Sequence, residues 1–179
     1  MDLIQIILLI ILILFLVFIL HQLMHLIRTP KIYNFKQEQF VRSDMETVFE
    51  FFSRPENLEK ITPPTMSFNI MTPRPIEMKE GSIIDYTVKI FGIPTRWRTI
   101  ITSYKKNESF VDEQLKGPYS YWHHKHSFEC VEGGINIIDE INYVLPLEAF
   151  RSIVHAVFIL PQLKKIFTFR FQIIQDKFN

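Results

Sequence analysis

The feature that most constrains this chain is an unbroken apolar run over residues 3–20, in which Gln5 is the only polar residue. Eighteen helical residues rising about 1.5 Å each span roughly 27 Å, which is close to the hydrocarbon thickness of a bilayer. A helix satisfies its own backbone donors and acceptors in lipid. The run therefore predicts a single transmembrane helix that tethers the rest of the chain to a membrane.

Two alternatives to an anchor are a cleaved secretory signal and a core helix of a soluble domain. A signal peptide begins with basic residues and ends at a small-residue cleavage site. This chain instead begins Met1-Asp2, and it leaves the run through His21 and Gln22. A core helix of a soluble domain would normally show a polar stripe, and this run has none. The anchor is therefore the favoured interpretation.

Basic residues near the run predict its orientation. None precedes it, and four follow closely: Arg28, Lys31, Lys36 and Arg42. The positive-inside rule then places the N-terminus outside and the body in the cytoplasm. We therefore expect a single-pass membrane protein with two parts, an anchor and linker over 1–30 and one ligand-binding domain over 31–179.

The composition of the body excludes some functions. All 20 Lys and Arg residues follow the run, together with 18 of the 19 acidic residues, which gives about +2. Such a balanced charge argues against a nucleic-acid partner. The 17 phenylalanines are a heavy aromatic load, and aromatic side chains fill cores or line apolar ligand cavities. The single cysteine, Cys130, fits a reducing compartment.

The body reads as a first strand, two short helices, further strands and a long terminal helix. The first strand is expected over 33–41, with Phe35 and Phe40 as candidate inward residues, and the second short helix over 56–61. Further strands are expected over 66–72, 82–91, 95–104, 109–115, 121–131 and 135–145. This order predicts an α+β fold with an antiparallel sheet that curls around the terminal helix.

Glycine and proline refine this outline. Gly133 and Gly134 predict a two-residue type I′ loop, in which both central residues have positive φ. Apolar residues take up a helical period after residue 146, and Pro161 is expected to kink that helix. Its basic residues, Lys164, Lys165 and Arg170, are expected on its exposed face.

Several motifs occur in order along the body. They are 48–52, 55–58, 61–64, 92–94 with Trp97, 110–114, 117–119, Trp122 with His124, His126 and Phe128, Asp139 with Tyr143 and Pro146, and 166–167 with Arg170. In these motifs the chain resembles the START/SRPBCC superfamily, and most closely its cyclase/dehydrase-like members. The resemblance covers about residues 35–170.

This resemblance implies a helix-grip fold, with a curved antiparallel sheet of six to seven strands around a long C-terminal helix. It also implies a deep apolar cavity that binds lipids, sterols, quinones, polyketides or other hydrophobic molecules. The same fold hosts carriers, cyclases and plain binding proteins, so it implies no single activity. Members of this type are often soluble, and the N-terminal anchor departs from that pattern.

Strand alternation gathers the polar candidates on one face. Positions 122, 124, 126 and 128 share a side of their strand. With Gly133 and Gly134 in the loop, His124 faces Tyr143, His126 faces Ile141 and Phe128 faces Asp139. A three-residue loop over 117–119 puts Asp112 opposite His124, whereas a two-residue loop puts Val111 and Glu113 there. The sequence leaves that choice open.

We expect nine residues to contact a ligand: Trp97, Asp112, Gln114, Trp122, His124, His126, Phe128, Asp139 and Tyr143. Three interpretations of the polar ones stay open. They form a buried hydrogen-bonded network, they orient the polar head of a ligand, or they carry chemistry. For chemistry the candidates are His124, His126 and Asp139, with a histidine as general base or as part of a metal site. Because few ligands are available, we expect no metal and no cofactor.

The favoured function is a membrane-tethered binding protein for a hydrophobic small molecule such as a lipid, quinone or polyketide. The bilayer would supply or receive that molecule, and binding without catalysis is favoured. One alternative is a cyclase or dehydratase that uses His124, His126 and Asp139. Another is an accessory subunit whose anchor packs against a membrane-protein partner.

Overall fold

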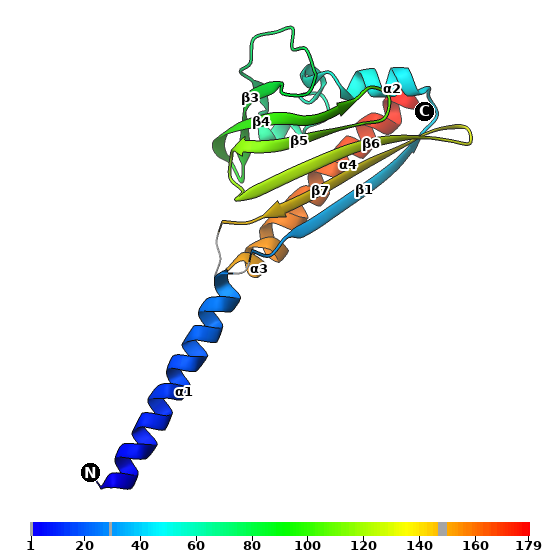
Figure 1. Cartoon of the computed structure of the whole chain (residues 1–179). Helices are drawn as coiled ribbons and strands as arrows, with labels where there is room; N and C mark the ends of the chain where they lie inside the picture. The colour runs from blue at the N-terminus through cyan, green and yellow to red at the C-terminus, as the bar shows by residue number, and fades with distance from the viewer. Residues whose placement is uncertain (1, 29, 147–149) are drawn as a thin grey trace.

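The computed structural model describes residues 2–28, 30–146 and 150–179. A long helix, α1 (Leu3–Arg28), projects from a body that consists of one sheet and a C-terminal helix (Figure 1). The elements of the body are β1 (Tyr33–Val41), α2 (Met45–Phe52), η1 (Pro55–Asn57), η2 (Pro64–Met66), β2 (Asn69–Ile70), β3 (Ile83–Ile90), β4 (Ile93–Lys105), β5 (Ser109–Lys116), β6 (Tyr121–Val131), β7 (Gly134–Val144), α3 (Arg151–Val154), η3 (His155–Ile159) and α4 (Leu160–Phe178).

The sheet has seven strands in the order β1-β7-β6-β5-β4-β3-β2, and every neighbouring pair is antiparallel. It curves around α4, with α2 at the far end from α1 (Figure 1). This architecture confirms the expected α+β helix-grip fold. The ends of β3 to β7 agree with the predicted ranges to within two residues.

Two apolar clusters hold α4 in the sheet. One joins α2 and the end of α4 to the sheet, around Phe49, Phe128 and Ile174. The other joins β1 and β7 to the start of α4, around Ile141 and Phe167. Each of these five side chains is at most 3% exposed. The two clusters thus pack both ends of α4 against the sheet. The site described below lies on the sheet face between them.

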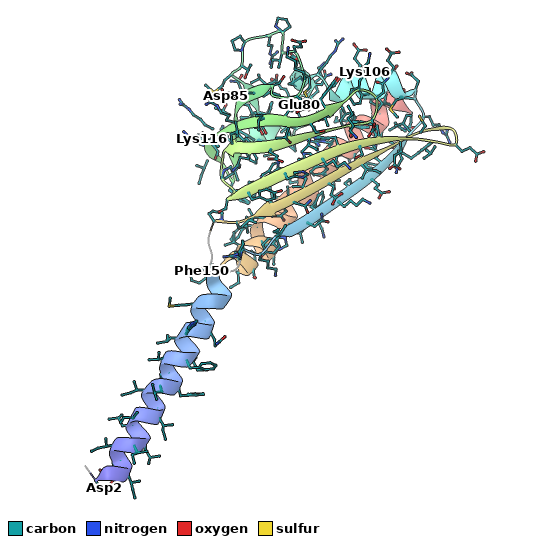
Figure 2. All side chains as sticks on the ribbon, viewed as in Figure 1. Asp2, Glu80, Asp85, Lys106, Lys116 and Phe150 are labelled. Carbon is teal, nitrogen blue, oxygen red and sulfur yellow. The ribbon has the colours of Figure 1, made fainter. Side chains whose placement is uncertain are left out.

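The helix α1 lies apart from the body. Its 26 residues correspond to about 39 Å of helix, and all described side chains over Ile4–Met24 are exposed. Figure 2 shows apolar side chains around its circumference, and the mean hydropathy of Ile4–Met24 is 3.2. The helix is thus long and apolar enough to span a membrane. The segment Arg151–Phe178 also meets these two criteria, with a mean hydropathy of 1.2, but it packs on the sheet.

Three local predictions are wrong. Phe40 is 42% exposed, whereas Phe35 is buried, because residues at odd spacing in a strand point to opposite faces. The expected strand over 66–72 is reduced to Asn69–Ile70. The expected second short helix is a single 3₁₀ turn over Pro55–Asn57.

Pro161 follows a change of helix type. The preceding segment His155–Ile159 is π-helical, and the N–H of Leu160 donates to the carbonyl of His155. Proline has no N–H to continue the α-helical ladder, and π segments occur where that ladder is interrupted. The interruption that the sequence predicts at Pro161 therefore occurs one turn earlier, in the π-helical segment η3.

The β6–β7 hairpin also differs from its predicted form. Val131 pairs with Gly134, so Glu132 and Gly133 form the loop, and of these two only Gly133 has a positive φ, at 82°. Gly134 lies outside the loop, at a position that has no room for a side chain. A Cβ there would lie 2.0 Å from the carbonyl oxygen of Val41. The absence of a side chain lets β1 approach closely at this point.

This change moves the predicted register by two residues. His124 faces Ile141, His126 faces Asp139 and Phe128 faces Ile137, instead of the partners Tyr143, Ile141 and Asp139 that the sequence predicts. A shift of two residues preserves which side chains share a face. The concave face therefore carries the expected histidines, now with Asp139 directly beside one of them.

Candidate functional site

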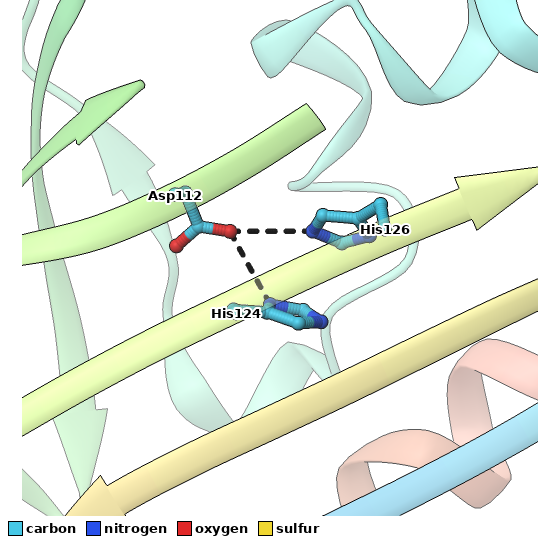
Figure 3. Close-up of side chains that lie close together, drawn as sticks. All are labelled: Asp112, His124 and His126. Atoms are coloured by element: carbon cyan, nitrogen blue, oxygen red, sulfur yellow. Dashed lines mark hydrogen bonds and ion pairs between the residues drawn. The ribbon is translucent and has the colours of Figure 1, made fainter. Parts of the chain in front are cut away.

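Four ionisable side chains meet on the concave face of the sheet, and we call them the tetrad. They are Asp112 of β5, His124 and His126 of β6, and Asp139 of β7. Asp112 pairs with His124 across the strands, as the three-residue alternative for the 117–119 loop predicts. Figure 3 shows one carboxylate oxygen of Asp112 joined by dashed lines to both imidazoles.

Each carboxylate of the tetrad contacts both imidazoles. Oδ2 of Asp112 lies 3.3 Å from Nδ1 of His124 and 3.2 Å from Nε2 of His126. Oδ1 of Asp139 lies 3.1 Å from Nε2 of His124 and 2.7 Å from Nδ1 of His126. The imidazole centroids are 3.8 Å apart. The two rings are thus held between two carboxylates, and of their four nitrogens the two Nε2 atoms make hydrogen bonds of normal geometry.

The tetrad is largely removed from water and has a basic neighbour. His124, His126 and Asp139 are at most 6% exposed, and Arg170 of α4 is 8% exposed. Nη1 of Arg170 lies 3.7 Å from Oδ1 of Asp139. Its Nε and Nη1 find no hydrogen-bond partner among the described residues. Burying N–H donors that have no acceptor costs free energy, so a further acceptor bound beside Arg170 would stabilise this arrangement.

Mutual attraction within the tetrad outweighs burial. Burial alone would raise the pKa of Asp112, but the adjacent His124 and His126 hold that pKa below its ordinary value. Burial acts in the same direction on Asp139, whose pKa is nevertheless lowered by His126, His124 and Arg170. Burial would lower the pKa of His124, but the carboxylates of Asp112 and Asp139 raise it. The tetrad therefore favours charged carboxylates and a charged His124.

These shifts predict how the stability of the body depends on pH. The lowered pKa values of Asp112 and Asp139 stabilise the fold above the ordinary carboxyl pKa of about 4, and this contribution is lost as pH falls through the folded-state values. The raised pKa of His124 stabilises the fold below about pH 6.5 and is lost as pH rises through its folded-state value. With EDTA present, calorimetry should find the highest melting temperature between about pH 4 and 6.5. A melting temperature that rises steadily up to pH 9 would contradict this.

A cavity of about 160 Å³ lies between the sheet, α2, η1 and α4, and its lining includes three residues of the tetrad. This resembles the volume of an engineered apolar cavity of about 150 Å³ that accepts benzene, so it accommodates one ring or a short acyl segment. Most of its wall is apolar, including Ile84, Val88, Ile101, Leu163, Ile166 and Phe167. Its ionisable part includes Asp112, His124, His126 and Arg170. The arrangement is an apolar pocket with a polar end, and the histidines at that end are able to accept or donate a proton.

Comparison with known proteins identifies the fold. No protein-family model matches the sequence, and no curated protein matches it. Ginseng major latex-like protein 151 aligns with a TM-score of 0.61 at 14% identity, over 83% of this chain and 98% of that one. The aromatase/cyclase ZhuI from a Streptomyces species aligns with a TM-score of 0.61 at 13% identity, over 80% and 92%. The chain has the SRPBCC fold. A Mycobacterium smegmatis protein, Ms6760, also aligns, with a TM-score of 0.59 at 13% identity over 83% and 94%.

Within the SRPBCC fold, the predicted ligand-contacting residues divide into two groups. The cavity is lined by five of them: Trp97, Asp112, Trp122, His124 and His126. The other four lie outside the lining for separate reasons. Asp139 is behind the histidines, Tyr143 is fully buried between sheet and helix, and Phe128 packs on α2. Gln114 braces the β5–β6 turn, because its Nε2 donates to the carbonyl of Tyr119 at 2.7 Å.

Arg170 is the main residue of this SRPBCC-fold site that the sequence analysis missed. It was expected on the exposed face of the C-terminal helix, together with Lys164 and Lys165. A signal was nevertheless present, because Leu163, Phe167, Arg170 and Ile174 recur at helical spacing, and all four are buried. The arginine thus lies on the inward stripe, where its guanidinium reaches the cavity and the tetrad.

Proposed function

We propose that this SRPBCC-fold chain is a membrane-tethered binding protein for a hydrophobic small molecule. The observation that carries the proposal is the apolar cavity between the sheet and α4, which has a few convergent polar groups at one end. Ligand sites in proteins characteristically combine these two properties. In this proposal residues 1–30 form the anchor and residues 31–179 the binding domain, and the basic residues after the anchor keep that domain in the cytoplasm.

The apolar surface near the tether supports exchange of the ligand with a bilayer. Phe91 lines the cavity and is half exposed, so the cavity reaches the surface there. Its ring contacts Phe158 at 5.9 Å between centroids. Other exposed apolar side chains occur on the same segments, namely Ile93, Phe150, Ile153 and Val157. His155, which follows α3, stacks on Tyr33 at the start of β1 with 3.8 Å between ring centroids, so the patch lies at the end of the body where the chain arrives from α1, and Figure 2 labels Phe150. Such a patch suits contact with lipid.

The polar end of the cavity restricts the chemistry of the ligand. Arg170 carries unused donors, and the indole Nε1 of Trp97 is buried without a hydrogen-bond partner among the described residues. Both side chains line the cavity. A ligand with an apolar body and an oxygen-bearing end would satisfy these donors, whereas a pure hydrocarbon would leave them unpaired. The proposed ligand is therefore a lipid-like, quinone-like or polyketide-like molecule with an acceptor group.

The two tryptophans of the chain provide a direct test, because both Trp97 and Trp122 line the cavity. Titrating the full chain in detergent with a short-chain quinone should quench their fluorescence in a saturable manner. Mass spectrometry of an organic extract of the purified protein should find a hydrophobic molecule in stoichiometric amount.

A matched pair of variants on α4 makes this test specific. Ile166→Trp fills the cavity and should reduce the co-purified ligand at least tenfold. Ile173→Trp makes the same change on a half-buried residue of the same helix outside the cavity lining, and it should retain the ligand. Equal retention by both variants, together with no saturable quenching of the natural chain, would refute the proposal.

A further inference from the structure

The tetrad packs two imidazoles between two carboxylates, and each imidazole makes one hydrogen bond of normal geometry. Nε2 of His124 pairs with Oδ1 of Asp139 at 3.1 Å, and Nε2 of His126 pairs with Oδ2 of Asp112 at 3.2 Å. Nδ1 of His126 has no hydrogen-bond partner among the described residues, and Nδ1 of His124 lies 3.3 Å from Oδ2 of Asp112. One nitrogen of each ring therefore converges on the same oxygen of Asp112, which is an arrangement that a single cation would share.

The positions of the two carboxylates distinguish their roles. Asp139 lies behind the histidines, outside the cavity lining, and its charge is also matched by Arg170 at 3.7 Å. Its Oδ1 makes a hydrogen bond with the far nitrogen of His124, Nε2, and lies 2.7 Å from Nδ1 of His126 without hydrogen-bond geometry. Metal-bound histidines characteristically donate this second N–H to a carboxylate. Asp112 instead lines the cavity, and its Oδ2 faces Nδ1 of His124 and Nε2 of His126.

We propose that Asp112, His124 and His126 bind a divalent first-row transition metal ion such as Zn²⁺ at the polar end of the cavity. One ligand atom from each residue lies within 4.8 Å of the other two (Figure 3). Two imidazoles and a carboxylate suit Zn²⁺ and its neighbours in the series, rather than Ca²⁺ or Mg²⁺. The expectation of no metal, made from the sequence, did not anticipate that Asp112 and Asp139 would lie on opposite sides of the histidines.

The distances to Asp112 agree with this coordination. Two ligands bound to Zn²⁺ at about 2.0–2.1 Å with tetrahedral angles lie roughly 3.3–3.4 Å apart. Oδ2 of Asp112 lies 3.3 Å and 3.2 Å from the two nitrogens that face it. Three protein ligands leave a fourth position, and all three residues line the cavity. That position faces the space where a ligand oxygen or a water would lie.

The proposal is tested with metal alone, so its outcome is independent of any hydrophobic ligand. The full chain without a histidine tag is purified in detergent, stripped with EDTA and dialysed. Titration with Co²⁺ should give saturable visible absorption bands of a four-coordinate ion at one equivalent per chain. Zn²⁺ should displace the Co²⁺ and abolish these bands, because both ions occupy the same site.

Three variants and one control locate the ion. Asp112→Asn and His126→Ala should each weaken Co²⁺ binding more than tenfold. Asp139→Asn should weaken it about 10- to 100-fold while retaining the bands, as expected for a residue that orients the ligands. His123→Ala should leave binding unchanged, because this histidine of β6 points to the outer face beside Glu113.

The fold of each variant is checked by circular dichroism, and Asp112→Asn is the informative one because it preserves shape. Failure of the natural chain to bind Co²⁺ saturably would overturn the proposal in favour of a tetrad held by hydrogen bonds alone. Equal affinity in Asp112→Asn and the natural chain would overturn it as well. Saturable quinone quenching without Co²⁺ binding would refute the metal site and leave the proposed ligand-binding function intact.

Discussion

The Asp139→Ala variant is expected to lose about 3–5 kcal/mol of unfolding free energy, the range observed when one partner of a buried ion pair is removed. Asp139 is 4% exposed, and its carboxylate contacts His124, His126 and Arg170. Without it, three buried basic groups share the single counter-charge of Asp112. Urea denaturation of the full chain in detergent, followed by circular dichroism at pH 6, measures this loss through the shift of the transition midpoint.

The neighbouring residue supplies the control. Glu140 follows Asp139 in β7, points to the outer face and accepts a hydrogen bond from Asn34 at 3.4 Å. Glu140→Ala should change the stability by no more than about 0.5 kcal/mol, as is usual for surface positions. If Asp139→Ala lost as little as Glu140→Ala, the tetrad would not be held by buried charge.

The concave face could be predicted from the sequence because it depends only on parity. Trp122, His124, His126 and Phe128 alternate with polar residues, and strands expose every second side chain to one face. Which residues face one another depends on the loop instead, and the adjacent Gly133 and Gly134 misled the prediction. Gly134 is required by its close contact with Val41 of β1. That contact is between strands distant in sequence, so local turn preferences could not show it.

The predicted site was incomplete for a related reason. Arg170 reaches the tetrad from α4, 31 residues beyond Asp139 in the chain. A basic residue on an amphipathic helix is normally exposed, and only its spacing with Phe167 and Ile174 indicated burial. The choice between Asp112 and Glu113 likewise depended on the length of the β5–β6 loop. Contacts between elements, rather than the elements themselves, were what a single sequence left open.

Removing residues 2–28 is expected to release the body from membranes completely. A central apolar residue contributes roughly −0.3 to −0.6 kcal/mol to membrane insertion, so the 18 apolar residues among the 21 of Ile4–Met24 contribute at most about 5–11 kcal/mol in favour of insertion. All described side chains over Ile4–Met24 are exposed and pack on nothing in the body, so the released body should keep its circular dichroism spectrum. Ultracentrifugation of cell lysates should move the protein from the pellet to the supernatant.

Point variants separate membrane insertion from mere loss of the segment. Leu9→Arg combined with Leu12→Arg should impair insertion, because each arginine near the helix centre opposes it by about 2.5–3.5 kcal/mol. Leu9→Phe with Leu12→Phe keeps the apolar character and should leave the protein in the pellet. N-terminal sequencing of the membrane-bound natural chain should begin at or next to Met1. A mature chain that begins after residue 20 would show a cleaved signal, and the bilayer would then no longer be the source of the ligand.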